Sequence, residues 1–283
     1  MIRKKTLIFG HTISQWLLFA VMLAICIFLI SPIIWLFSAS LQDNAAIYQS
    51  NFAWIPKDFH WTNYTQAWTD AGIGRAFLNT IFVSAIMLTF HLFFCTFAGY
   101  VLGKYQFKNR ALIITLITMT MMLPQEVTYF PVYSMMREMG LLNSYFGLAM
   151  PFFVSGMGVF LMMQFSQYVP TEIMEAARID GCGEFSIFFR VALPLMLPSI
   201  SALGILAFTF IWNEYAWARL AASSTKMNTL SITLSMIANN SDSTIQDVVL
   251  LAGGVITILP IMLLFICFSK NFIESVTKSG LKG

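Results

Sequence analysis

Long apolar stretches without charge are the feature that most limits what this chain can fold into. A helix needs about 20 apolar residues to cross the roughly 30 Å hydrocarbon core of a bilayer. Five stretches reach this length without any Asp, Glu, Lys or Arg: residues 13–39, 76–103, 145–165, 191–213 and 248–269. A sixth, from Ala111 to about Tyr133, is interrupted by Pro124, Glu126 and Pro131, and we interpret it as a span with a bent outer end. The sequence therefore predicts an all-α polytopic membrane protein with six transmembrane helices.

Composition excludes several other classes of protein. Of the 283 residues, 58% are hydrophobic and only 10% are charged, against about 25% charged in soluble domains. A soluble enzyme, a disordered chain and a disulfide-built secreted domain are excluded, and membrane lipid is the expected surrounding. The formal net charge of +3 is too small to suggest nucleic-acid binding.

The residue patterns of catalytic and metal sites are missing from the sequence. The four cysteines form no CxxC motif and no Cys/His cluster, so neither a metal nor a disulfide is indicated. No G-x-x-x-x-G-K-[ST] phosphate-binding loop and no HExxH motif occur. We expect no catalytic residues, no metal ligands and no cofactor bound by this chain.

Basic residues predict the orientation, because Lys and Arg concentrate in cytoplasmic loops. With six spans, eleven basic residues fall on the side of the two termini and five on the other. Both termini should therefore be cytoplasmic, and the first span is too long for a signal-peptide core. The longest outer loop, residues 42–75, is rich in aromatic side chains. They suit either an interfacial belt or a lip that touches an external partner. No internal repeat is evident, so we expect one helical bundle over 1–283.

The cytoplasmic loop over residues 170–194 should contain two short helices. Thr171 can cap the first, Glu175 and Arg178 are spaced to form an ion pair, and Gly181 is a natural stop. The second helix places Phe185, Phe188 and Phe189 at spacings that share one face. Periodicity alone fits an interfacial helix at least as well as a docking surface for a partner.

The residues of this loop resemble a known motif. Glu175-Ala176-Ala177, then Gly181, then Leu193-Pro194 resembles the EAA loop of ATP-binding-cassette (ABC) importer permeases, with Val191 in place of the usual Ile. In that family the loop is a coupling helix that inserts into a groove on the cytoplasmic ATPase. The resemblance implies an ATPase-coupling site made of Glu175, Ala176, Ala177, Arg178, Asp180, Gly181, Phe185 and Phe188.

Further segments resemble the sugar-type branch of these permeases, which is similar to the smaller membrane subunit of the maltose transporter. They are Arg178–Gly181, Trp212–Tyr215, Phe77–Thr80, Met122–Pro124 and the end Gly280–Gly283. The resemblance implies a type I ABC importer transmembrane domain in a bacterial cytoplasmic (inner) membrane. It also implies a second permease subunit, an ABC ATPase dimer that carries ATP and Mg, and an extracytoplasmic solute-binding protein. The cytoplasmic tail, residues 270–283, would lie near the ATPase.

Polar residues at membrane depth are costly, so each is a functional candidate. The candidate substrate path for a hydroxyl-rich solute consists of Asn79, Glu126, Trp212, Asn213, Glu214 and Tyr215. Glu214 is equally compatible with interfacial water and a pair with Arg219, and a structural role is favoured for Glu126. We expect His91 to form an interhelical hydrogen bond rather than a proton relay.

The main alternative is a subunit of an ion-coupled secondary transporter. Such a protein needs charges near the membrane midplane and usually shows repeat symmetry. Glu126, Glu214 and His91 give little support for it, and the sequence does not identify the solute.

Overall fold

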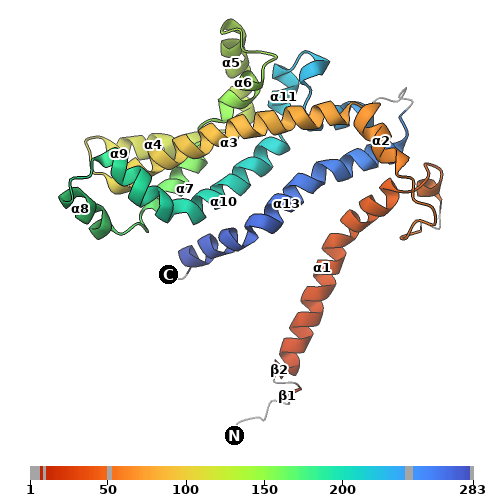
Figure 1. Ribbon diagram of the computed structural model, residues 1–283, viewed down its shortest axis with the longest axis horizontal. Helices are drawn as coiled ribbons and strands as arrows, with labels where there is room; N and C mark the ends of the chain where they lie inside the picture. The colour runs from red at the N-terminus through yellow and green to blue at the C-terminus, as the bar shows by residue number, and fades with distance from the viewer. Residues whose placement is uncertain (1–6, 9–10, 50–52, 240–244, 281–283) are drawn as a thin grey trace. The chain divides into compact units, whose positions relative to one another are not determined.

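The computed structural model describes residues 7–8, 11–49, 53–239 and 245–280 (Figure 1). By its internal contacts the chain forms two compact units. The first consists of Met1–Ala71 and Asn240–Ile256, and the second of Gly72–Asn239 and Thr257–Gly283.

The first unit is built around a long apolar helix, α1 (Ile13–Ser40). Before it, the two-residue strands β1 (Leu7–Ile8) and β2 (His11–Thr12) pair in antiparallel fashion. After it come a 3-10 turn, η1 (Ala46–Tyr48), helix α2 (Thr62–Thr69) and the start of α13 (Asp247–Gly280). The buried Asn63 amide donates hydrogen bonds to the carbonyls of Ser40 and Gln42, at 3.0 and 2.9 Å, and so joins α2 to the end of α1.

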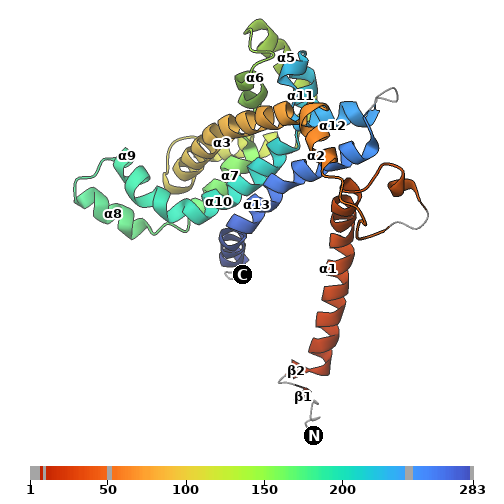
Figure 2. The ribbon, with the colours of Figure 1, turned by 45° about the vertical axis from the view of Figure 1, so that its right-hand side comes forward.

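The second unit consists of helices around α3 (Ile73–Lys104), which packs against α7 and α10 (Figure 2). The other elements are α4 (Arg110–Thr120), α5 (Gln125–Glu138), α6 (Tyr145–Ala149), η2 (Met150–Phe152), α7 (Gly156–Ser166), α8 (Thr171–Ile179), α9 (Glu184–Ile187), the π-helical turn η3 (Phe188–Ala192), α10 (Leu193–Trp212), α11 (Ala216–Ala221), η4 (Thr225–Met227), α12 (Leu230–Asn239) and the rest of α13.

The helices confirm the predicted six-span membrane fold. Four helical stretches are long and apolar enough to cross a bilayer, namely Gln15–Ser40, Ile73–Lys104, Glu184–Trp212 and Asp247–Phe268. Two bent helix pairs complete six spans if each pair is one span.

The third span bends more sharply than expected. Helix α4 has 11 residues, which at a 1.5 Å rise gives about 16 Å, roughly half of the hydrocarbon core. The axis then turns by 99° into α5. Pro124 lies at the start of α5, where its missing N–H is tolerated.

The fourth span is not the continuous helix that the sequence predicts. Its axis bends by 54° between Tyr145–Phe152 and Gly156–Ser166. Pro151 lies in the last turn before the break, and Ser155 starts the new helix because its hydroxyl accepts a hydrogen bond from the Gly158 N–H at 2.9 Å. Local residues therefore end one helix and start the next inside a single apolar stretch.

Glycines allow α3 and α7 to approach closely. A Cβ added at Gly99 would lie 2.6 Å from the Met162 Cβ, and one at Gly103 would lie 1.9 Å from the Ser166 Oγ. Gly99 and Gly103 are four residues apart, so both face the same neighbouring helix, as in small-xxx-small membrane packing.

Candidate coupling loop and membrane pocket

Helix α8 ends in a complete Schellman motif. Gly181 adopts the left-handed conformation with φ of +83°. The Gly181 N–H bonds to the Arg178 carbonyl and the Cys182 N–H to the Ala177 carbonyl, both at 3.0 Å. Gly181 is thus the helix stop that the sequence predicts, and the chain reverses there toward α9.

Two local predictions for this helix are wrong. Pro170 occupies the N-cap position, so Thr171 lies inside the first turn and does not cap the helix. Arg178 pairs with Glu184 rather than with Glu175, with Nε–Oε1 and Nη2–Oε2 distances of 2.7 and 3.2 Å. The turn at Gly181 causes this exchange because it brings α9 back beside the end of α8.

One face of α8 is held by the fold and the other is free. Met174 is 2% exposed and packs in a cluster with Tyr100, Val169 and Phe188. The α8 side chains that the resemblance assigns to ATPase coupling differ in their exposure to solvent. Glu175, Ala176, Arg178, Asp180 and Gly181 are exposed, whereas Ala177 is half-buried.

The three phenylalanines share one face in part, because Phe185 and Phe188 both pack on the Phe97 ring and Phe189 packs on Phe188. Phe188 is 2% exposed and packs edge-on against Phe97, whereas Phe185 and Phe189 are 70% and 48% exposed. The turn η3 is π-helical, which changes the angular spacing of side chains after Ile187. Phe188 is therefore a core residue, and Phe185 is available at the surface of the loop.

Polar groups join the loop to the end of α3. Tyr105 donates a hydrogen bond to Glu184, and its ring lies 5.9 Å from the Arg178 guanidinium carbon. The Tyr100 hydroxyl lies 3.3 Å from that of Tyr105. Burial, with a further effect of the Glu184 carboxylate, raises the pKa of Tyr105. At the other end of the loop, the Lys104 ammonium donates to the Val169 carbonyl.

Two of the predicted substrate-path residues are buried anchors. Asn79 is 2% exposed, and its amide donates to the carbonyls of Lys226 and Asn228 at 2.9 and 2.8 Å. Tyr145, which the sequence analysis missed, donates to the Asn79 side-chain oxygen at 2.8 Å. Trp212 is 1% exposed, and its indole N–H bonds to the Thr257 carbonyl at 3.0 Å. These contacts favour a structural role for Asn79 and Trp212.

Glu214 caps a short helix. Its carboxylate accepts a hydrogen bond from the Trp217 N–H at 2.6 Å, at the start of α11, and a longer one from Tyr129 at 3.4 Å. Among the described residues it forms no ion pair with Arg219. Burial raises the pKa of Glu214 despite these donors.

The other three candidates are exposed side chains. Asn213 donates to the Thr209 carbonyl one turn earlier, at 2.8 Å, and Ser235 lies within 3.4 Å of the Tyr215 hydroxyl. Glu126 lies in the first turn of α5, where the helix dipole favours an acidic side chain. The structure thus brings Glu126 and Glu214 together beside Tyr129, whereas Asn79 and Trp212 make their contacts with other residues.

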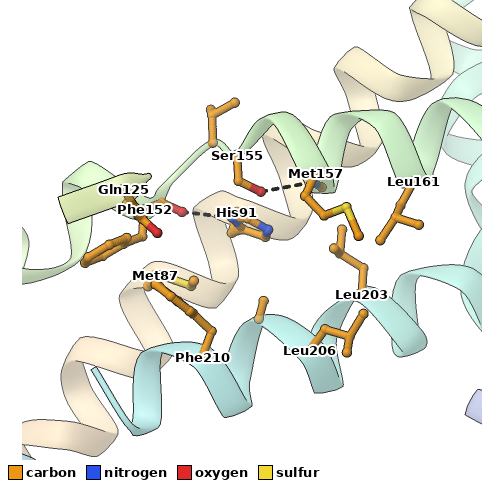
Figure 3. Close-up of a pocket in the computed structure, with 13 residues that line it drawn as sticks. Met87, His91, Gln125, Phe152, Ser155, Met157, Leu161, Leu203, Leu206 and Phe210 are labelled. Carbon is orange, nitrogen blue, oxygen red and sulfur yellow. Dashed lines mark hydrogen bonds between the residues drawn. The ribbon is translucent and has the colours of Figure 1, made fainter. Parts of the chain in front are cut away.

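A cavity in the second unit lies beside the break in the fourth span (Figure 3). It measures about 330 Å³ and has mainly apolar walls from α3, α7 and α10. His91 faces the break, and its Nδ1 lies 2.8 Å from the Phe152 carbonyl, which confirms the predicted interhelical hydrogen bond. Gln125 and Ser155 are the other polar residues of the wall. Such a lining suits apolar groups better than a hydroxyl-rich solute.

The fold and the loop together define a polytopic helical permease. Residues 95–278 match the family described as "Binding-protein-dependent transport system inner membrane component", about two thirds of the chain. The chain belongs to this family. It is a membrane-spanning permease subunit of an ABC importer, and nothing supports the ion-coupled alternative.

Relatives agree with this assignment over nearly the whole chain. The arabinooligosaccharides transport system permease protein AraQ of Halalkalibacterium halodurans is 34% identical over 96% of this chain and 98% of its own length. The sn-glycerol-3-phosphate transport system permease protein UgpE of Yersinia pestis is 30% identical over 92% and 95%. A chain of a bacterial ABC transporter that imports the acidic polysaccharide alginate is 25% identical, with a TM-score of 0.82 over 93% of this chain and 99% of that one.

Proposed function

We propose that this chain is one of two permease subunits in an importer for a carbohydrate or a related polyol. The second subunit is a different permease, and an extracytoplasmic solute-binding protein delivers the solute. The functions of the relatives support this class, since their names assign them to the transport of arabinooligosaccharides or sn-glycerol 3-phosphate. An oligosaccharide is the first choice because the arabinooligosaccharide permease is 34% identical to this chain and the sn-glycerol-3-phosphate permease 30%.

The loop over residues 170–194 is the proposed docking site for the ATPase dimer. The observation that carries this proposal is the two-sided environment of α8, with Met174 buried in the bundle and the Glu175–Gly181 side chains mostly exposed. ATP and Mg bind the ATPase subunits, and closure of their dimer moves α8. A conformational change of this kind needs contacts that differ between the two states, because a partner shifts an equilibrium only by its differential affinity.

The proposed orientation places both termini and the coupling loop in the cytoplasm. It rests on the eleven basic residues on that side against five on the other. The protein would then reside in the bacterial cytoplasmic membrane, with the tail over residues 270–283 near the ATPase. Residues 281–283 lie outside the described part of the chain.

We also propose that the exposed residues Glu126, Asn213 and Tyr215 line part of the solute path. Asn213 provides amide hydrogen-bonding groups, and Tyr215, 41% exposed, provides an aromatic face on which a sugar ring can stack. Asn79, Trp212 and Glu214 would have structural roles, because their polar groups already bond to other residues.

Gentle affinity purification from the native membrane tests the assembly. We expect a P-loop ATPase, a second six-span permease and a binding protein to co-purify with the wild-type chain. Glu175→Lys should lose the ATPase and keep the second permease, while Glu138→Gln, an exposed carboxylate on α5, should keep both. Recovery of the ATPase with Glu175→Lys at the wild-type ratio would contradict the docking site.

Uptake measurements test the solute class. A deletion strain that carries the gene on a plasmid should take up labelled arabinotriose, and uptake should stop on ATP depletion with ion gradients maintained. Preferential uptake of glycerol 3-phosphate would move the assignment to polyol phosphates.

A further inference from the structure

We propose that a two-point attachment to the end of α3 makes α8 a lever on the second span. The attachment consists of the Lys104–Val169 and Tyr105–Glu184 hydrogen bonds. This inference rests on the proposed docking of an ATPase at α8. It assigns Tyr105 and Glu184 as positioning residues, which act through α8 and do not touch ATP or solute.

The two hydrogen bonds flank α8 in the sequence, one just before the helix and one just after it. Val169 immediately precedes Pro170, where α8 begins, and Glu184 opens α9 just after the turn at Gly181. Their partners, Lys104 and Tyr105, are neighbours at the C-terminal end of α3. A force on α8 therefore reaches one helix end through both of its flanking segments.

Apolar and charged contacts make the attachment stiff. Met174 and Phe188 are both 2% exposed and share a cluster with Tyr100 of α3. Phe188 packs on the Phe97 and Tyr100 rings, with centroids 5.2 and 5.0 Å apart. On the other side of the turn, the Arg178–Glu184 pair ties the end of α8 to the start of α9 at 2.7 Å. The loop cannot bend freely at Gly181 without breaking this pair.

The Tyr105–Glu184 bond is a polar contact, and a polar contact fixes direction as well as proximity. A Tyr hydroxyl and a carboxylate have defined bonding directions, and a charge-assisted hydrogen bond is roughly twice as strong as a neutral one. Glu184 also receives the Arg178 guanidinium in a two-bond geometry. Glu184 thus contacts both Tyr105, at the end of α3, and Arg178 of α8.

Spin labels on the assembled transporter test the transmission. In a background without native cysteines, one label replaces Ile179 at the end of α8, which is 86% exposed, and another replaces Leu78 near the start of α3, which is 50% exposed. ATP with vanadate closes the ATPase. We expect both labels to change mobility in the parent, whereas Tyr105→Phe with Glu184→Gln should keep the α8 response and lose part of the α3 response.

Two matched variants separate the attachment from general stability. Tyr105→Phe alone keeps the ring and its packing but removes the hydrogen bond to Glu184, so it should show a smaller loss in the same direction. Glu138→Gln removes an exposed carboxylate outside the loop and should respond like the parent.

Each outcome decides the proposal. If the α3 label in the double variant responds as in the parent, the proposal is overturned. It is also overturned if the double variant loses assembly of the transporter to the same extent as it loses the α3 response, because the two residues would then act in folding alone. If the α8 label in the parent does not respond to vanadate, the docking proposal fails, and this inference fails with it. A retained α8 response with a reduced α3 response supports both.

Discussion

At the scale of single residues, Gly181 shows how one backbone angle sets the shape of the coupling loop. Its φ of +83° is left-handed, and a Cβ added there would meet nothing within 4 Å. The cost of a side chain at this position is therefore conformational rather than steric, roughly 1–2 kcal/mol for most residues.

Gly181→Ala should therefore impair coupling without preventing membrane insertion. A penalty of this size shifts a local equilibrium by roughly 5- to 30-fold, so the Schellman turn would open and α9 would lose its position beside α8. Uptake and membrane content, measured on the same cells, check this expectation. Gly181→Asn should be milder because Asn tolerates the left-handed region, and equal uptake by all three proteins would contradict the argument.

Asn79 offers a test between an anchor and a solute contact. Asn79→Ala removes three hydrogen bonds between helices and loops, each worth about 0.6 kcal/mol by membrane-protein measurements, or about 2 kcal/mol together. We expect a lower melting temperature of the purified complex in detergent. Tyr145→Phe removes one of these bonds and should cost about a third as much. Unchanged melting with loss of uptake would favour the solute path instead.

At the scale of helices, the sequence predicts what depends on local composition. The length of an apolar stretch can be read directly from the sequence, so all six spans were identified. The helix end at Gly181 was predicted for the same reason, because it depends on the glycine itself. The Arg178–Glu184 pair could not be predicted, because it depends on how the chain turns after Gly181. The break in the fourth span depends on Pro151, on the Ser155 cap and on His91 from another helix, whereas hydropathy shows only one continuous stretch.

Contact between α3 and α7 should be the helix packing most sensitive to added volume. Gly99→Ala would place its Cβ 2.6 Å from the Met163 backbone nitrogen, so the helices must separate, at a cost of about 1–3 kcal/mol. Gly204→Ala on α10 is the matched control, because its Cβ would lie 3.7 Å from the Leu92 Cδ1, an ordinary contact. Thermal unfolding in detergent should show a clear loss for Gly99→Ala and little change for Gly204→Ala. Equal losses would show that α3 and α7 can move apart at little cost.

At the scale of the whole molecule, the charge distribution makes a topological prediction. Fluorescent protein fused after Gly283 should fluoresce, and alkaline phosphatase inserted at Lys57 in the longest outer loop should be active, because the positive-inside rule places these positions on opposite sides. The reciprocal fusions serve as controls. Active phosphatase after Gly283 would reverse the orientation and move the 170–194 loop away from any cytoplasmic ATPase.

The glycine contacts between α3 and α7 also fix the distance between these two helices. Since Gly99 and Gly103 leave no clearance against Met162 and Ser166, these two helices cannot slide past each other without first coming apart. A pair of probes with one member on each helix should therefore report the same separation throughout the transport cycle. Any change measured from α7 to another helix then reports movement of that helix relative to the α3–α7 pair.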